Sequence, residues 1–200
     1  MPSRLPRVGV NPGGFSLVEL IVVIAIVSLL FALTFPALRA ARESGRRTAC
    51  KDNLRGIGIS LYEYLDGNGC FPEAAVEPTT DNPLNLPSLA EALSMTRTPR
   101  LFQCPDDFYR RQDAVAVMAR AGLSSLPTSY FALEGTSYAY EMIVSGRTPV
   151  QLLAAGLESS EIMASADFAP FHGATDHNGS QNFLYVDGHV DCTTVASTGF

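Results

Sequence analysis

A long apolar segment near the N-terminus constrains this chain more than any other feature. Residues 20–38 are 19 consecutive positions without Asp, Glu, Lys or Arg, and a bilayer core requires a helix of about 20 apolar residues. The one charge within the apolar helix itself is Glu19, in its first turn. A carboxylate at such a place costs free energy, so a functional role is the default hypothesis for it. A short leader that contains Arg4 and Arg7 and ends in Gly14 precedes the helix.

The stretch Gly-Phe-Ser-Leu-Val-Glu-Leu at residues 14–20 resembles the N-terminus of type IV prepilins and type II secretion pseudopilins. In that family, a prepilin peptidase that is also a methyltransferase cuts after the leader glycine and methylates the new N-terminal residue. The resemblance implies that Gly14 is the last leader residue, that Phe15 is the methylated terminus and that Glu19 is the family's assembly glutamate. Pro36 falls where many pilins carry a proline that loosens the helix.

A second resemblance lies near the C-terminus, where nine residues separate His177 from Asp187-Gly188. This pattern resembles the processing-associated H-X9-DG motif of one large bacterial branch of pilin-like proteins. Three further stretches also resemble that branch, at residues 50–58, 104–107 and 136–141. The resemblance therefore extends over most of the chain, and it departs at Cys70 and Cys192, which are extra cysteines.

The orientation of the chain in a membrane has two opposing indications. More Lys and Arg residues follow the apolar segment than precede it, and the positive-inside rule alone would keep the C-terminal part in the cytoplasm. The leader motif implies the reverse, a periplasmic C-terminal part on a single-pass protein of the bacterial inner membrane. An ordinary signal peptide is disfavoured. The apolar run of a signal peptide is shorter than the one in this chain, and it ends in a small-x-small cleavage site.

Charge is distributed unevenly along the chain. Residues 1–55 hold 8 basic and 3 acidic side chains, whereas residues 56–200 hold 6 basic and 17 acidic ones. Phosphate binding requires clustered Lys and Arg, so the acidic C-terminal part argues against a nucleic-acid partner. The basic residues just beyond the apolar segment could face anionic headgroups, pair with acids of a neighbouring subunit, or form a solvated helix face.

The predicted fold class is α+β and pilin-like, with three regions: a leader at 1–14, a long helix at 15–66 that spans the membrane at 15–38, and an extracytoplasmic globular domain at 67–200. The distal half of the helix carries an apolar stripe at helical spacing that should dock on a small antiparallel sheet. The stripe is Leu54, Ile57, Gly58, Leu61, Tyr62 and Leu65.

Aromatic and β-branched content predicts short strands at 101–104, 130–133, 137–144 and 162–168. Near the end, Asp187-Gly188 favours a tight hairpin with a two-residue turn. That turn would pair Tyr185 with Val190 and Phe183 with Cys192. These four side chains would then share the face of the hairpin that covers the helix.

The four cysteines contain no Cys-x-x-Cys spacing, which excludes a zinc knuckle or a thioredoxin motif. An oxidising compartment allows three pairings of four cysteines. Because Cys50 and Cys104 both lie in stretches that resemble the family branch, the resemblance suggests the pairs Cys50–Cys104 and Cys70–Cys192. Free buried thiols are the alternative.

A metal site is a weaker expectation. His177, Asp187 and His189 are residue types that bind Zn²⁺ or Ca²⁺, and some major pseudopilins hold Ca²⁺ in a C-terminal loop. Structural roles explain the same residues more simply, with Asp187 in a turn and His177 bonded to backbone groups. We therefore expect no cofactor, with Ca²⁺ as the exception to test.

The function implied by the resemblance is that of a structural subunit, and hydrolase motifs and a phosphate-binding loop are absent from the sequence. The expected partners are prepilin peptidase, other pilin or pseudopilin subunits, and the inner membrane. One alternative is a membrane-tethered envelope protein whose loops at 71–88 and 165–180 bind a ligand or partner. Another is a secreted hydrolase with a simple signal sequence. The sequence leaves open whether the filament is a pilus, a secretion pseudopilus or a DNA-uptake fibre.

Overall fold

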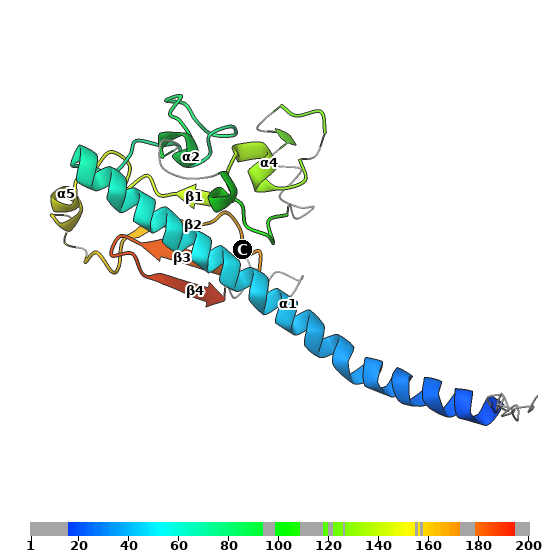
Figure 1. Ribbon diagram of the computed structural model, residues 1–200. Coiled ribbons are helices and arrows are strands. Elements are labelled where there is room, and N and C mark those ends of the chain that lie inside the picture. Colours follow the sequence, from blue (N-terminus) through cyan, green and yellow to red (C-terminus); the bar gives the residue numbers. More distant parts are fainter. Residues whose placement is uncertain are drawn as a thin grey trace, which may run out of the picture. The chain divides into compact units, whose positions relative to one another are not determined.

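The computed structural model describes residues 16–93, 99–108, 118–119, 122–125, 127–154, 156, 158–172 and 179–194. The chain divides into two compact units, residues 1–42 and residues 43–200. The helices and strands follow in the order α1 (Leu17–Asn68), α2 (Leu89–Ala92), the 3₁₀ turn η1 (Pro99–Phe102), α4 (Tyr130–Glu134), β1 (Tyr138–Tyr140), α5 (Pro149–Leu153), β2 (Met163–Asp167), β3 (Ser180–Tyr185) and β4 (Val190–Thr194) (Figure 1).

The first unit contains the apolar half of α1. This helix begins where the Glu19 carboxylate accepts the backbone N–H of Ser16 at 2.9 Å, which satisfies one of the free donors at a helix start. Its hydroxyl groups bond within the helix, since Ser28 donates to the carbonyl of Ile24 and Thr34 donates to that of Leu30. Such internal bonding suits a helix that lies in lipid, where no water is present to satisfy polar groups.

Within the part of the chain that the structure describes, α1 is the helix long and apolar enough to cross a membrane. Its most apolar 18-residue window has a mean hydropathy of 2.8, and 0% of that window is buried. A core helix of a soluble protein would bury this surface against its own chain. The apolar half of α1 therefore has to be covered by lipid or by other molecules.

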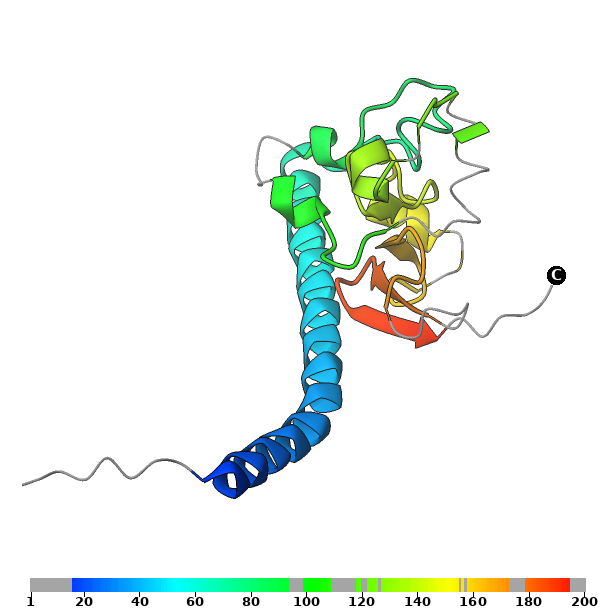
Figure 2. The same cartoon turned by 90° about the vertical axis from the view of Figure 1, so that its right-hand side faces the viewer.

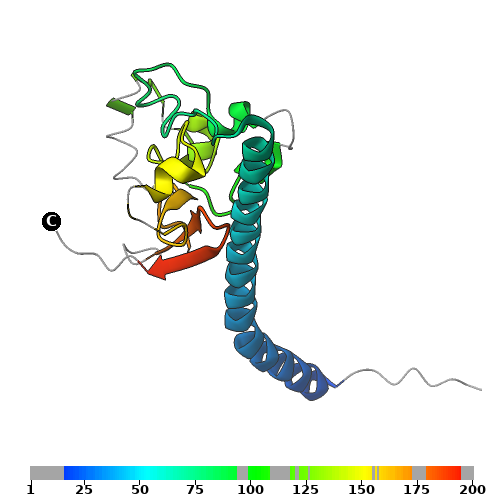
Figure 3. The same cartoon turned by 90° about the vertical axis from the view of Figure 1, so that its left-hand side faces the viewer.

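In the second unit, the remainder of α1 packs against the sheet. Its buried residues recur every three or four positions, as a single face of a helix requires: Cys50, Leu54, Ile57, Gly58, Ser60 and Leu61. Gly58 lets the sheet approach closely, because a Cβ at this position would lie 3.1 Å from a methyl carbon of Leu184 on β3. Figures 2 and 3 show the strands beside this part of α1 from two directions.

The sheet has four antiparallel strands in the order β1-β2-β3-β4. Along β3, Ser180, Asn182 and Leu184 are buried and the residues between them are half-buried, so one face of this strand points into the core. The arrangement of a long helix on a small antiparallel sheet confirms the predicted α+β, pilin-like fold class.

The hairpin between β3 and β4 differs from the prediction by one residue. Leu184 pairs with Val190, and Asn182 pairs with Cys192. The turn contains three residues rather than two, because Gly188 adopts a φ of 90° and the Tyr185 N–H bonds to the carbonyl of His189 at 3.0 Å. This is the three-residue loop that ends in a left-handed glycine. The prediction also chose the wrong face of β3, because the alternation along the strand buries Asn182, Leu184 and Val186 rather than Phe183 and Tyr185.

Two of the four predicted short strands are confirmed, as β1 within 137–144 and β2 within 162–168. The other two predictions were wrong. Residues 101–104 lie partly in η1, and residues 130–133 form α4. Helix α4 forms because its first backbone N–H groups find acceptors, Ser129 for Ala132 and the Asp107 carboxylate for Tyr130 and Phe131. These caps outweigh the β propensity of the two aromatic residues.

Candidate functional site

The N-terminal end of α1 is the first candidate site. Gly14 and Phe15 lie outside the described residues. Glu19 is exposed in the first turn of α1, where the positive end of the helix dipole favours a carboxylate. The residues that follow Glu19 form a continuous apolar surface that the chain itself does not cover. This end of the helix thus presents one negative charge beside a surface suited to lipid or to other apolar helices.

A second candidate is a buried polar cluster in the globular unit, which we define as Asp106, Asp107, Ser137, Asp167, His172 and Asn182. All of its members except Asp107 have at most 9% of their surface exposed. Buried polar groups are costly unless they are hydrogen-bonded, so their mutual contacts decide what the cluster does.

The Asp107 carboxylate connects the segment after η1 with α4 and with the residue that precedes β1. Its carboxylate accepts backbone N–H bonds from Tyr130 at 2.9 Å and Phe131 at 2.7 Å, and a hydroxyl bond from Ser137 at 2.6 Å. Ser137 in turn accepts the N–H of Cys104 at 3.0 Å. Burial raises the pKa of Asp107, while these hydrogen bonds oppose the rise. These hydrogen bonds hold α4 and the start of β1 against the segment that follows η1.

His172 lies at the centre of the cluster. Its Nδ1 is 3.0 Å from Asp106, and its Nε2 is 3.6 Å from Asp167. Burial lowers the pKa of His172, and the Asp106 carboxylate acts against this change. Burial raises the pKa of Asp106, with a further contribution from Glu43, whereas Arg46 lowers it. The Arg46 guanidinium forms ion pairs with both Asp106 and Glu43, which closes the network onto α1.

Asp167 and Asn182 join β2 to β3 through side chains. One oxygen of Asp167 accepts both the backbone N–H and the side-chain amide of Asn182, each at 2.8 Å. Burial raises the pKa of Asp167 to about 7, with the Asn182 bonds opposing it. Three buried atoms here have no hydrogen-bond partner in the described part of the chain: the second oxygen of Asp167, the amide oxygen of Asn182 and Nε of Arg47.

A disulfide lies beside this cluster. Cys50 and Cys104, the first pair that the resemblance suggested, are joined with their Cα atoms 5.2 Å apart. The sulfur of Cys104 lies 3.7 Å from the ring of His172. The bridge fixes the distal half of α1 to the segment after η1.

The second expected pair does not form, since Cys70 and Cys192 are both free. Cys192 accepts a bond from Arg47 at 2.6 Å, whereas Cys70 follows the end of α1 at Asn68. The 21 residues of helix between Arg47 and Asn68 rise by about 30 Å. A disulfide requires Cα atoms within about 7 Å of one another. The two thiols are therefore too far apart within one chain.

The weak metal candidates have other partners where they are described. His177 lies outside the described residues. Asp187 and His189 bond to each other, with 2.5 Å between the carboxylate and Nδ1, and the His189 ring stacks on Tyr185. Partial burial acts to raise the pKa of Asp187, but the His189 bonds hold it below its ordinary value. The contact between Asp187 and His189 therefore stabilises the turn between β3 and β4.

Glu43, Asp106 and His172 form another set of donors, with their ligand atoms within 4.8 Å of one another. These residues could not be grouped from the sequence, because they are 63 and 66 positions apart. The Arg46 guanidinium already supplies a positive charge to both carboxylates. The arrangement therefore fits an ion-pair network better than a cation site.

The stretches that resemble the pilin-like branch meet at this cluster. Cys50 and Asn53 come from the first stretch, and the Asn53 amide donates to the Gln103 carbonyl and the Tyr138 hydroxyl. Cys104, Asp106 and Asp107 come from the second stretch, and Ser137 comes from the third. Asp167 and His172 lie outside these stretches. His172 is one of three histidines within residues 172–189, residue types that can bind a metal, but nothing in the sequence singles out Asp167.

Comparison with known proteins gives two family matches. Residues 11–35 match the prokaryotic N-terminal methylation motif. Residues 39–86 match a family described as a protein of unknown function, DUF1559. The H-X9-DG resemblance is not among these matches.

A curated relative also matches, the type II secretion system core protein G of Pseudomonas aeruginosa. It is 32% identical over 76 residues, which are 35% of this chain and 54% of that protein. The chain thus spans about half the length of the relative that it matches. No solved structure gives a significant match.

Proposed function

Because the chain carries a prepilin-type N-terminal methylation motif on a pilin-like fold, we propose that it is a structural subunit of a type II secretion pseudopilus or a type IV pilus-like filament. Pilin-like proteins are structural subunits and not enzymes. The observation that carries the proposal is the apolar half of α1, which has Glu19 at its start and 0% of its most apolar window buried. A filament that packs these helices together would bury that surface.

Processing is the first part of the proposal. Prepilin peptidase would cut after Gly14 and methylate the amine of Phe15, and both residues fall within the matched motif. The helix would then remain in the bacterial inner membrane as a single span, with the globular unit in the periplasm. The Cys50–Cys104 disulfide supports this orientation, because disulfides persist in oxidising compartments and are rare in the cytosol.

Assembly is the second part. Cleavage would create a charged amine at Phe15, and a charge that is buried among apolar helices needs a partner of opposite sign. Glu19 of a neighbouring subunit would supply that partner and set the register, much as one buried polar residue sets the register of a coiled coil. Other subunits and the peptidase are thus the partners that we propose.

Intact mass and N-terminal sequencing of the protein from its native membranes test this proposal. We expect a chain that starts at N-methyl-Phe15. A chain that starts at Met1 or beyond Pro36 would overturn the processing step and, with it, the filament role.

A second candidate function is a membrane-tethered envelope protein whose globular unit binds a ligand or partner. A groove of about 510 Å³ favours it, because most of its lining falls within the loop at 71–88. This candidate predicts a processed, membrane-bound chain that forms no filament. Electron microscopy of surface or overexpressed filaments separates the two functions.

A further inference from the structure

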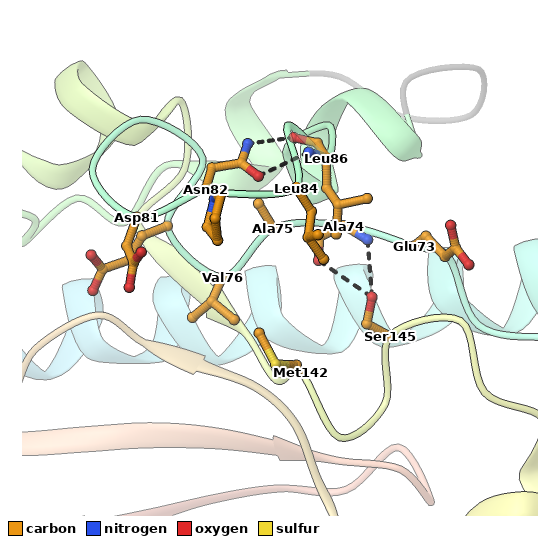
Figure 4. A pocket seen from close by; sticks show the side chains of 12 residues that line it. Glu73, Ala74, Ala75, Val76, Asp81, Asn82, Leu84, Leu86, Met142 and Ser145 are labelled. Carbon is orange, nitrogen blue, oxygen red and sulfur yellow. Dashed lines mark hydrogen bonds between the residues drawn. The ribbon is translucent and has the colours of Figure 1, made fainter.

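The groove in the globular unit lies between residues 73–86 and the segment that follows β1. Its apolar lining includes two strongly exposed side chains, Leu84 at 72% and Met142 at 69%. Exposed apolar side chains that gather in a hollow mark an interaction surface. Figure 4 shows these residues around the groove, with Glu73 and Asp81 at its opposite ends.

Hydrogen bonds hold the walls of the groove in place. Asn82 donates to the Leu86 carbonyl at 2.7 Å and accepts the Leu86 N–H at 2.8 Å. On the other wall, the Ser145 hydroxyl accepts the Ala74 N–H at 3.2 Å and donates to the Ala74 carbonyl at 3.3 Å. The loop is also anchored to α4 through Glu134. A preformed groove of this kind loses less entropy when it binds.

The charged side chains that line the groove are all acidic: Glu73, Glu77 and Asp81. Glu77 accepts a hydroxyl bond from Thr80 at 2.7 Å, while Glu73 and Asp81 are exposed. A partner that fits this surface must bring both apolar and positively charged side chains. An anionic lipid or a nucleic acid would be repelled.

The chain itself carries a segment with that chemistry. Phe35, Leu38, Arg39 and Arg42 on α1 occupy positions i, i+3, i+4 and i+7, which places them on one face of the helix. The apolar pair is exposed, at 54% for Phe35 and 49% for Leu38. The guanidinium of Arg39 lies 4.6 Å from the ring centroid of Phe35, consistent with a shared face. Anchors at i, i+3, i+4 and i+7 are those of a helix that binds in a groove.

We propose that this groove binds residues 35–42 of a second copy of the chain, an inference that rests on the proposed filament function. Leu84 and Met142 contact the apolar pair, while Asp81 and Glu73 pair with Arg42 and Arg39. The groove and the helical segment are different surfaces of one chain, so the contact is heterologous and each added copy leaves one of each surface open. Such contacts extend into helical filaments unless the ring closes.

The proposed contact requires residues 35–42 to leave the lipid before they can bind. Residues 35–42 lie at the outer end of the proposed span, where lipid would cover Phe35 and Leu38. The segment becomes accessible to the groove of a neighbour when the subunit moves outwards.

Cross-linking between two tagged full-length copies tests the contact, in a background with Cys70→Ser and Cys192→Ser. One copy carries Leu38→Cys and the other carries Leu84→Cys, and a short thiol cross-linker is applied to assembled filaments. We expect a cross-linked product that contains both tags. The matched control places the second cysteine at Val150→Cys, which is 76% exposed and outside the groove, and we expect no product.

Charge reversal provides an independent measurement. Asp81→Arg and Arg42→Asp should each cause loss of filaments, because each places like charges together, and the double variant should regain them. Filaments that form normally in both single variants, or that give no cross-link through Leu84→Cys, overturn the contact while leaving the filament function intact. A cross-link through Leu84→Cys to a different protein also overturns it. If the wild-type chain forms no filament, the proposed function fails and this inference fails with it.

Discussion

At the scale of single residues, Glu19 has one observed contact and one proposed role. In the chain alone, its carboxylate accepts the Ser16 N–H and so helps to begin α1. In the proposed filament, its charge pairs with the amine of a neighbouring Phe15. Glutamine can accept the hydrogen bond but carries no charge, and valine can do neither.

We therefore predict that Glu19→Val and Glu19→Gln both insert into the membrane and are processed, yet fail to form filaments. Membrane fractionation checks insertion, N-terminal sequencing checks processing, and electron microscopy counts filaments. Normal filaments in Glu19→Gln would show that the charge is not needed and would remove the register argument.

Ser137 carries a second prediction at this scale. Its hydroxyl donates to Asp107 and accepts the Cys104 N–H, so Ser137→Ala removes one of the three bonds to Asp107 and leaves the buried N–H of Cys104 without this acceptor. The expected loss is about 1–3 kcal/mol of the free energy of unfolding, the cost of unsatisfied buried polar groups. Chemical denaturation of the full chain in detergent measures it.

The matched control for Ser137 is Ser125→Ala, at an exposed position, where we expect a change within about 0.5 kcal/mol. Equal changes in the two variants would mean that the Ser137 bonds do not stabilise the fold.

At the scale of elements, the sequence predicted those helices and strands whose apolar residues repeat at a regular local spacing. The apolar stripe of α1 was predicted because one face repeats over several turns. The β3–β4 hairpin was placed correctly, but its register was wrong by one residue, since Asp187-Gly188 suits either a two-residue turn or the end of a three-residue loop. Helix α4 was missed because two of its first N–H groups bond to Asp107, more than 20 positions away, in addition to the local cap from Ser129.

The buried polar cluster was also not predicted, because it too depends on contacts between residues that are distant in the sequence. Its members lie on β2, on β3 and in loops, one of them just before β1, and α1 contributes Arg46. No spacing in one sequence connects Asp106 with His172 or Asp167 with Asn182. The stretches that resemble the pilin-like branch pointed to some of these positions, but not to the contacts between them.

The Cys50–Cys104 bridge gives a prediction at this scale. It closes a loop of 54 positions between α1 and the segment after η1, for which chain entropy predicts a stabilisation of roughly 4 kcal/mol. We expect the double variant Cys50→Ser, Cys104→Ser to lose stability by up to that amount in detergent. Reduction of the wild type should have a similar effect.

Cys70→Ser is the control, because Cys70 is a free thiol, and its unfolding midpoint should stay close to that of the wild type. An unchanged midpoint in the double variant would mean that the distal half of α1 is held by packing alone.

At the scale of the whole molecule, the chain carries two surfaces that suit other molecules. The apolar half of α1 is uncovered, and the acidic globular unit offers a groove that fits a basic, apolar helix face. Assembly would satisfy both surfaces at once. The buried polar cluster contributes differently, by holding the sheet, α4 and the distal half of α1 together as one body that can be carried into a filament.

Because that cluster contains a buried carboxyl group, the stability of the globular unit should depend on pH. The pKa of Asp167 is raised to about 7 from an unfolded value near 3.8. Between these values the folded state binds more protons than the unfolded state, so this group stabilises the fold fully below about pH 4 and loses that contribution as the pH rises towards 7. His172 acts in the opposite direction, because its pKa is lowered in the folded state.

Asp167→Asn isolates the carboxyl contribution, since the amide retains an oxygen that can accept from Asn182 and does not titrate. We predict that the difference in unfolding free energy between this variant and the wild type shifts in favour of the variant between pH 4.5 and pH 8, by on the order of 2–4 kcal/mol. Denaturant titrations of both full chains in detergent, at several pH values, measure this difference. A difference that stays constant over this range would mean that Asp167 is already ionised at low pH, with a compensating charge such as Arg47 close enough to hold it.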